Sequence, residues 1–265
     1  MKMTISENYI DKDILFIVQS EIRLKILTEL CIRPQTIREI VDKTHMIYSS
    51  VSNNMNKLEY KNHVIKDNRV YTINPMTKIY FKQLMEFKRS IDVIQNYNSL
   101  WYKHDINHIN IQLIEDITKL YKSKLIETNP IDIYKTHNNI KKQLRSSNDV
   151  KGILPYIHPE YPRLIENVLK RHGKVELIME KNIYKAFVSK INDKLRRKSM
   201  KNGMFKIHVM KENLQLYLLI CDDTMNLGLF RNDGSYDQNR ILNSSTQDSM
   251  DWANCLFNTI KEKVI

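Results

Sequence analysis

Residues 49–66 read SSVSNNMNKLEYKNHVIK, and this stretch decides the fold of the N-terminal part of the chain. Val51, Met55 and Leu58 recur at i, i+4 and i+7, which is the spacing of a helix with one apolar face. At 100° per residue, these side chains fall within about 60° of one another. The Val-Ile pair near the end of the stretch is typical of a strand. The stretch therefore predicts a helix that is followed by a strand.

The flanking residues extend this pattern in both directions. Residues 12–30 carry apolar positions near helical spacing, enough for one buried helix or two in succession. A short amphipathic helix is expected over 36–43, and a hairpin over 64–73. Helices followed by a hairpin are the order of a winged helix-turn-helix. We therefore interpret residues 1–75 as a DNA-binding domain of that type.

The expected third helix has a polar face opposite its apolar one. Ser and Asn are poor formers of helix interiors, so their concentration here favours a surface that contacts a partner. Asn can pair with adenine in the major groove, Ser and Lys can contact phosphate, and an Arg at the hairpin tip can enter a minor groove. The alternative is a solvated face enriched in Asn by genome composition. The predicted DNA-binding residues are Ser49, Ser50, Asn53, Asn56, Lys57 and Arg69.

Composition narrows the classes of function. The 265 residues include 42 Lys and Arg against 30 Asp and Glu, and the net charge of +12 favours a polyanionic partner. The motifs GxGxxG and GxxxxGK[ST] are absent, which excludes those two classes of nucleotide-binding enzyme. The longest apolar run is about eight residues against roughly 20 for a membrane span, and the N-terminus lacks a signal-peptide pattern. We expect a cytoplasmic protein without a membrane partner.

The cysteines do not indicate a metal or disulfide framework. Cys31, Cys221 and Cys255 stand far apart, without CxxC or Cys/His spacing. No GxSxG, HExxH or paired-carboxylate spacing occurs either. The sequence therefore predicts no metal, no cofactor and no catalytic site.

Residues 76–103 show a different period. A 4-3 spacing of the kind found in coiled coils predicts a linker helix that joins two copies of the chain, although such a helix can also pack on its own chain. The seam is formed by Tyr80, Leu84, Phe87, Ile91, Ile94, Asn98 and Trp101. We expect a homodimer held partly by this helix.

Residues 104–265 alternate between helical and strand patterns. Such alternation implies an α/β domain with a mixed, largely parallel sheet, to which a late hairpin adds antiparallel strands, within a chain that is α+β overall. Helices are expected over 109–120, 131–144, 159–172, 183–198 and 247–261, and strands over 123–127, 150–156, 175–179, 205–210, 214–221 and 225–230. Ligands of open α/β sheets bind beyond the carboxyl ends of strands, where Tyr156 and His158 follow one expected strand.

Two known families resemble parts of this chain. SEIRLKILTEL, TIREIVDKT and SSVSNNMNKLEYKNHVIK, within residues 20–66, resemble the ArsR-type winged helix of bacterial and archaeal regulators. In metal-sensing members two cysteines open the second helix, whereas Thr36 and Arg38 stand at the matching positions here. This resemblance implies DNA binding without metal sensing.

Nearly the whole chain resembles the archaeal Fil-type methanogenesis regulators, in which an ArsR-like domain precedes a sensor region. The matching stretches are WYKHD at 101–105, VKGILP at 150–155 with His158-Pro159, and NLGLF, DGSYD and WANCLF between 226 and 257. The resemblance implies a one-component transcriptional regulator.

A weaker likeness bears on catalysis. LQLYLLICDDTMNLG at 214–228 resembles the strand and hairpin of phospholipase D-type phosphodiesterases, whose signature is His-x-Lys, four residues and Asp. Gln215, Tyr217 and Asp222 occupy those positions. Gln cannot form a phospho-enzyme and Tyr is no cation, which favours binding over cleavage. We predict a ligand site at Tyr156, His158, Gln215 and Tyr217.

The leading hypothesis is a regulator that is not an enzyme, binds double-stranded DNA and responds to a small-molecule effector. One alternative is a phosphodiesterase-type enzyme with a nucleic-acid-binding module. Another is a non-catalytic protein whose winged helix contacts protein.

Overall fold

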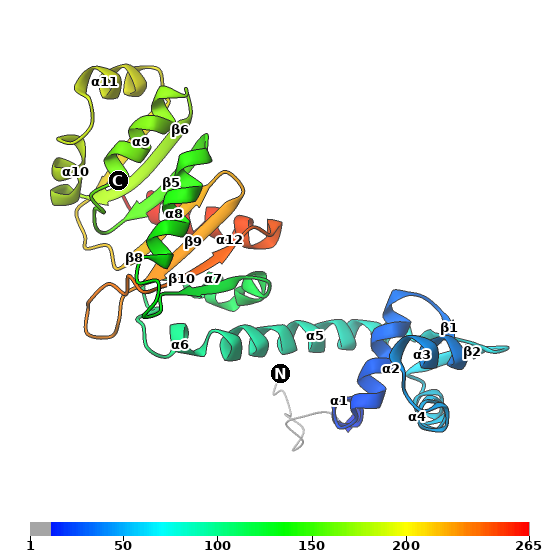
Figure 1. Ribbon diagram of the computed structural model, residues 1–265. Coiled ribbons are helices and arrows are strands. Elements are labelled where there is room, and N and C mark those ends of the chain that lie inside the picture. The colour runs from blue at the N-terminus through cyan, green and yellow to red at the C-terminus, as the bar shows by residue number, and fades with distance from the viewer. Residues whose placement is uncertain (1–11, 265) are drawn as a thin grey trace, which may run out of the picture. The chain divides into compact units, whose positions relative to one another are not determined.

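The computed structural model describes residues 12–264. The chain forms two compact units that divide between Lys88 and Arg89, within helix α5 (Pro75–Asn96), and each unit is described by itself. Figure 1 shows the elements along the chain. Among the described residues, no helix combines the length and the hydropathy needed to cross a membrane.

The first unit is built from small helices and a three-stranded sheet. Its elements are α1 (Lys12–Val18), α2 (Glu21–Ile32), β1 (Gln35–Thr36), α3 (Ile37–Thr44), α4 (Tyr48–Tyr60), β2 (Val64–Asp67) and β3 (Val70–Ile73). The sheet has the order β1-β3-β2 and both pairings are antiparallel. Ser20 separates α1 from α2, because its side chain accepts a hydrogen bond from the backbone N–H of Arg23 and caps α2.

The core of this unit is the set of apolar positions that the helical spacing predicts. Val51, Met55 and Leu58 on α4 are fully buried and belong to one cluster with Ile26 and Leu27 on α2. Burial of one face of α4 leaves its opposite face in solvent. The register of α4 is therefore determined by three side chains of its own sequence.

A capping box sets the start of α3. The backbone N–H of Thr36 donates to Glu39 Oε2 over 2.8 Å, and the backbone N–H of Glu39 donates to Thr36 Oγ1 over 3.3 Å. The Thr36 backbone N–H, the Arg33 guanidinium and the Thr36 hydroxyl together lower the pKa of Glu39 to about 2. Ionised Glu39 therefore stabilises the folded state.

This capping box predicts a pH-dependent effect of Glu39→Gln. A folded-state pKa below the unfolded value of about 4.3 adds stability that is fully present above that value and is lost as the pH falls toward 2. The difference in melting temperature between the wild-type protein and Glu39→Gln should thus be largest at pH 7 and shrink by pH 3. Circular dichroism melts at both pH values measure it. An equal difference at pH 7 and pH 3 would contradict the assignment.

The linker prediction is wrong in its last part. A single helix over 76–103 was expected, whereas α5 ends at Asn96 and a separate short helix, α6 (Asn98–Trp101), begins at Asn98. Tyr97 lies between them, buried, and its hydroxyl donates to the carbonyl of Ser123. Its backbone, with φ of −115° and ψ of 29°, departs from helical geometry and separates α5 from α6. The Trp101 indole donates to the Val93 carbonyl at the end of α5 over 3.1 Å.

The second unit is centred on a seven-stranded sheet of order β4-β10-β9-β8-β5-β6-β7. Its strands are β4 (Lys124–Glu127), β5 (Asp149–Leu154), β6 (Lys174–Glu180), β7 (Phe205–Met210), β8 (Leu216–Cys221), β9 (Thr224–Leu229) and β10 (Arg240–Ser244). Only β5-β6 and β6-β7 pair in parallel, and the other four pairings are antiparallel. The sheet is mixed as predicted, but the expectation that it is largely parallel is wrong.

The antiparallel part of the sheet arises from two features, the late hairpin that the sequence predicts and a strand that it does not predict. β8 and β9 form a hairpin, in which Asp222 adopts a left-handed φ of 48°. β10 was not predicted at all, because only Ile241 and Leu242 are apolar in a polar stretch. β10 forms because it pairs with β9 and β4, although its own sequence carries little strand pattern.

Several helices of this unit are shorter than predicted or divided in two, whereas α12 is one residue longer. The helices are α7 (Ile111–Glu115), the 3-10 helix η1 (Ile117–Leu120), α8 (Lys135–Ser146), α9 (Tyr161–Lys170), α10 (Lys181–Val188), α11 (Asp193–Lys201) and α12 (Gln247–Glu262). The helix expected over 183–198 is two helices, because Asn192 caps α11 by accepting from the backbone N–H of Leu195 over 3.0 Å. The helix expected over 109–120 is likewise two, α7 and η1.

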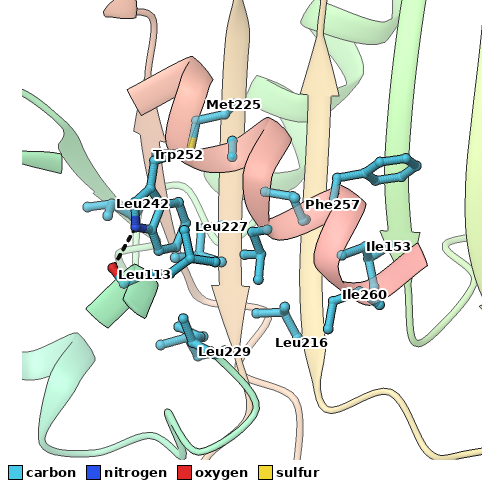
Figure 2. Close-up of a cluster of buried hydrophobic side chains, with 14 of the residues drawn as sticks. Leu113, Ile153, Leu216, Met225, Leu227, Leu229, Leu242, Trp252, Phe257 and Ile260 are labelled. Carbon is cyan, nitrogen blue, oxygen red and sulfur yellow. Dashed lines mark hydrogen bonds between the residues drawn. The ribbon is translucent and has the colours of Figure 1, made fainter. Parts of the chain in front are cut away.

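The sheet is buried on both faces. Along β8, Leu216, Leu218 and Ile220 join one apolar cluster with α12, whereas Tyr217 and Leu219 join a second cluster with α8 and α9. Figure 2 shows the first cluster, in which Trp252 and its neighbours on α12 cover strands β8 and β9. Helices on both faces account for the continuous apolar run of β8.

Candidate functional site

In the first unit, the polar side of α4 is exposed as a group. Ser49, Asn53, Asn56 and Lys57 are exposed, and Ser50 is half-buried. The neighbouring Asn54 is used within the unit, because its side chain donates to the Ser50 carbonyl over 2.9 Å and accepts from Arg23 over 3.4 Å. Side-chain amides and hydroxyls on one exposed helix face can hydrogen-bond base edges.

A concave depression of about 680 Å³ lies between α3, the first residue of α4 and the β2-β3 hairpin. The residues that line it are Thr36, Ile37, Arg38, Tyr48, Lys66, Asn68, Arg69 and Tyr71. Three of them are cationic, and Lys66 Nζ lies 5.5 Å from the centroid of the Tyr71 ring. A concave surface with three cations and hydrogen-bonding neighbours suits a phosphate backbone.

We name this surface, formed by Arg38, Lys66 and Arg69, the basic depression. The hairpin turn supports it, because Asn68 adopts a left-handed φ of 53°, a conformation that Asn tolerates well. Of its cations, only Arg69 was predicted from the sequence. Arg38 and Lys66 were missed, although each occupies an exposed position on an element that had been predicted.

In the second unit, a pocket of about 340 Å³ lies near the end of β5 and the start of α8. We name it the tyrosine pocket. The residues that line it are Ile133, Tyr134, Thr136, His137, Ile140, Tyr156, His158, Tyr161, Tyr236, Gln238, Asn239 and Ile241. The structure therefore brings together two of the four predicted ligand residues, Tyr156 and His158, at the carboxyl end of a strand.

The other two predicted residues lie differently. Tyr217 is fully buried behind the pocket wall, with its hydroxyl 3.1 Å from that of Tyr161. The prediction that Gln215 belongs to this pocket is wrong, because Gln215 borders a separate depression of about 50 Å³. β8 begins only at Leu216, so Gln215 precedes the strand and does not follow its alternation.

The tyrosine rings form a packed wall. The ring centroid of Tyr156 lies 4.5 Å from that of Tyr236 and 5.7 Å from that of Tyr217. Gly228 permits this packing, because a Cβ there would lie 2.5 Å from the Tyr236 hydroxyl oxygen. Burial raises the pKa of Tyr217 and Tyr236 well above the ordinary value, so both stay neutral.

A buried ionic cluster holds the loop that carries Tyr236. Both carboxylate oxygens of Asp237 are used: Oδ2 accepts from His104 Nε2 over 3.0 Å and from Arg240 over 3.1 Å, and Oδ1 accepts from Arg231 over 3.1 Å. The side chains of His104 and Asp237 are fully buried. The DGSYD stretch therefore contributes both Tyr236, which lines the pocket, and Asp237, which holds the loop in place.

Two imidazoles and a carboxylate meet at the side of the tyrosine pocket. The ring centroids of His137 and His158 lie 3.5 Å apart in a stack. His137 Nε2 lies 2.9 Å from one oxygen of Glu160, and Lys141 Nζ lies 2.5 Å from the other. Lys141, and next His137, lower the pKa of Glu160 to about 2. Burial, followed by the proximity of His137, lowers the pKa of His158 below its usual value.

The positions of the phosphodiesterase-like signature are not assembled into one site. Tyr217 lies near the start of β8, whereas Asp222 follows its end. The Asp222 carboxylate accepts hydrogen bonds from the backbone N–H groups of Asn148 and Asp149, over 3.0 and 2.8 Å. Asp222 thus fastens the β8-β9 hairpin to the start of β5.

Comparison with known proteins bears on this second unit in particular. Residues 133–263 match the family model described as the middle domain of methanogenesis regulatory protein FilR1. The curated methanogenesis regulatory protein FilR1 of Methanothrix harundinacea (strain 6Ac) is 27% identical over 170 residues, which are 63% of this chain and 38% of that protein. Both findings support the resemblance of this chain to the Fil-type regulator family. The matched region contains every residue that lines the tyrosine pocket.

Two solved structures are also similar. The archaeal chromatin protein TrmBL2 aligns at a TM-score of 0.41 and 13% identity, over 95% of this chain and 98% of that one. The phospholipase D family member Nuc from Salmonella typhimurium aligns at a TM-score of 0.38 and 10% identity, over 54% of this chain and 93% of that one.

Proposed function

We propose that this protein is a transcriptional regulator that binds double-stranded DNA through a winged helix-turn-helix unit, residues 12–75. The observation that carries the proposal is the exposed polar face of α4, in the same unit as the basic depression. In such a unit α4 is the recognition helix and the β2-β3 hairpin is the wing. The curated relative's name, a methanogenesis regulatory protein, supports a role in regulation.

The polar face of α4 and the basic depression are suited to different parts of the DNA. The amide groups of Asn53 and Asn56 are suited to base edges in the major groove, whereas Arg38, Lys66 and Arg69 are suited to phosphates. Lys57, at the exposed side of α4, adds a further phosphate contact. Base contacts specify the sequence and phosphate contacts supply affinity.

This division predicts different effects of Asn53→Ala and Lys57→Ala. Asn53→Ala should cost about 1 to 3 kcal/mol at one base position, because a bidentate contact to one base is lost. Lys57→Ala should weaken binding to all sequences about equally. A preferred sequence is first selected from randomised DNA, and fluorescence anisotropy then compares it with random DNA for each variant. Equal losses on both DNAs for Asn53→Ala would contradict the base-reading role.

Salt dependence separates this function from a protein-binding winged helix. Each neutralised phosphate contributes a slope of about −0.9 to the logarithm of affinity against the logarithm of salt concentration. A steep negative slope on duplex DNA supports the proposal, and the absence of DNA binding at low salt would overturn it. The homodimer expected from the sequence stays a prediction; it would space two copies of α4 about one turn of DNA apart.

We further propose that the second unit senses a small-molecule effector in the tyrosine pocket and does not catalyse a reaction. The pocket is lined by aromatic rings and by the polar groups of Thr136, Gln238 and Asn239. Asp222 and Tyr217 are engaged in the structural contacts described above, which supports a binding role over phosphodiester cleavage. An effector that binds here must change DNA affinity, and DNA must change effector affinity by the same factor.

A further inference from the structure

The strongest unassigned cluster in the described residues is formed by His137, His158 and Glu160. Each offers one ligand atom, these atoms all lie within 4.8 Å of one another, and all three residues are half-buried. They come from the first turn of α8 and from the segment that joins β5 to α9. The fold thus brings His137, on α8, next to His158 and Glu160, which are more than 20 residues away in the sequence.

We propose that His137, His158 and Glu160 bind a divalent transition-metal ion. Two imidazole nitrogens and one carboxylate oxygen form the donor set that suits Zn²⁺ and its first-row neighbours, whereas Ca²⁺ and Mg²⁺ prefer oxygen ligands. The ion would lie between His137 Nε2 and the nearer Glu160 oxygen, which are 2.9 Å apart. Small rotations of the two side chains replace their direct contact with one bond from each residue to the ion.

Lys141 is the positioning residue of this site. Its ammonium holds the second oxygen of Glu160, so that the first oxygen faces His137. A partner that orients a metal-binding carboxylate is a regular feature of protein metal sites. The charges of Lys141 and Glu160 cancel, and the bound ion therefore leaves the site with a net positive charge.

Three protein ligands leave a tetrahedral ion one open position. His137 and His158 also line the tyrosine pocket, so the open position is adjacent to its space of about 340 Å³. The positive charge of the loaded site favours an anionic group as the fourth ligand. The tyrosine pocket thus takes a small anion-bearing molecule that the metal ion holds at one end. This second step rests on the proposed sensor function, whereas metal binding itself does not.

The test is a metal titration of the full chain, produced without a histidine tag and stripped with a chelator. Calorimetry with ZnCl₂ should give one strong site per chain, and Co²⁺ should give the visible absorption of a tetrahedral ion. His137→Ala and Glu160→Gln should each weaken Zn²⁺ binding by roughly 100-fold or more, since loss of a direct ligand costs at least as much as loss of an orienting partner.

The chain offers a matched control. His208 Nε2 lies 2.8 Å from Glu176 Oε1 elsewhere on the sheet, in a pair that lacks a second imidazole. His208→Ala should leave the strong site intact, and circular dichroism melts show that each variant is folded. Absence of a strong site in the wild-type chain, or its loss in His208→Ala and not in His137→Ala, would overturn the proposal. DNA binding is measured separately with the metal-free chain, so failure of the metal site leaves the DNA result unaffected.

Discussion

Replacing Arg38, Lys66 and Arg69 together with alanine is expected to lower DNA affinity by about 100- to 1,000-fold at 0.1 M salt. The basic depression gathers these cations on one concave surface, where each can neutralise one phosphate. Three lost phosphate contacts should also reduce the slope of log affinity against log salt by about 3. Anisotropy titrations of a labelled duplex at several salt concentrations measure both quantities.

A second triple variant separates local contacts from total charge. Lys194, Lys198 and Lys201 are exposed on α11 in the second unit, and their replacement removes the same net charge. This control should retain nearly the wild-type DNA affinity. Equal losses in the two triple variants would show that overall charge, and not the basic depression, accounts for binding.

Trp252→Ala should lower the free energy of unfolding of the second unit by about 3 to 5 kcal/mol. Trp252 is among the largest fully buried side chains, and its indole N–H donates to the Leu113 carbonyl over 2.8 Å (Figure 2). The substitution leaves a cavity over the sheet and removes the donor of a buried carbonyl. Urea denaturation followed by circular dichroism measures the loss.

Trp252→Phe separates the cost of lost apolar volume from the cost of the lost hydrogen bond. Phe keeps much of the apolar volume but provides no donor for Leu113, so its cost should lie between zero and that of Trp252→Ala. A loss below about 1 kcal/mol for Trp252→Ala would show that α12 does not hold this face of the sheet.

The candidate DNA-binding face was largely predictable from the sequence. Val51, Met55 and Leu58 are buried, so Asn53 and Asn56 on the opposite side are exposed. That inference needs only the period of one helix. The basic depression could not be predicted from the period of one helix, because Arg38 lies on α3 and Lys66 lies on β2. Which of many exposed cations come together depends on how the hairpin folds beside α3.

The tyrosine pocket was predictable only in part. Tyr156 and His158 follow a strand, and the general position of ligands in such sheets places them at its edge. His137 was not found, because it lies 21 residues before His158 on a helix whose start the periodicity located too early. Gln215 was included in error, because a resemblance of motifs carries no information on where a strand begins.

The amino-acid sequence by itself determined the local elements with strong periodicity: α4 and its buried face, the doubly buried strand β8, and the closing helix α12. In each element, the apolar spacing indicates which side is buried. Burial of that side is the largest favourable contribution to the free energy of folding of a short element. The tertiary structure alone decided the direction of most strand pairings, the existence of β10, the break at Tyr97 and the meeting of His137 with Glu160. These depend on contacts between residues far apart in the chain, whose energies are absent from any local window of sequence.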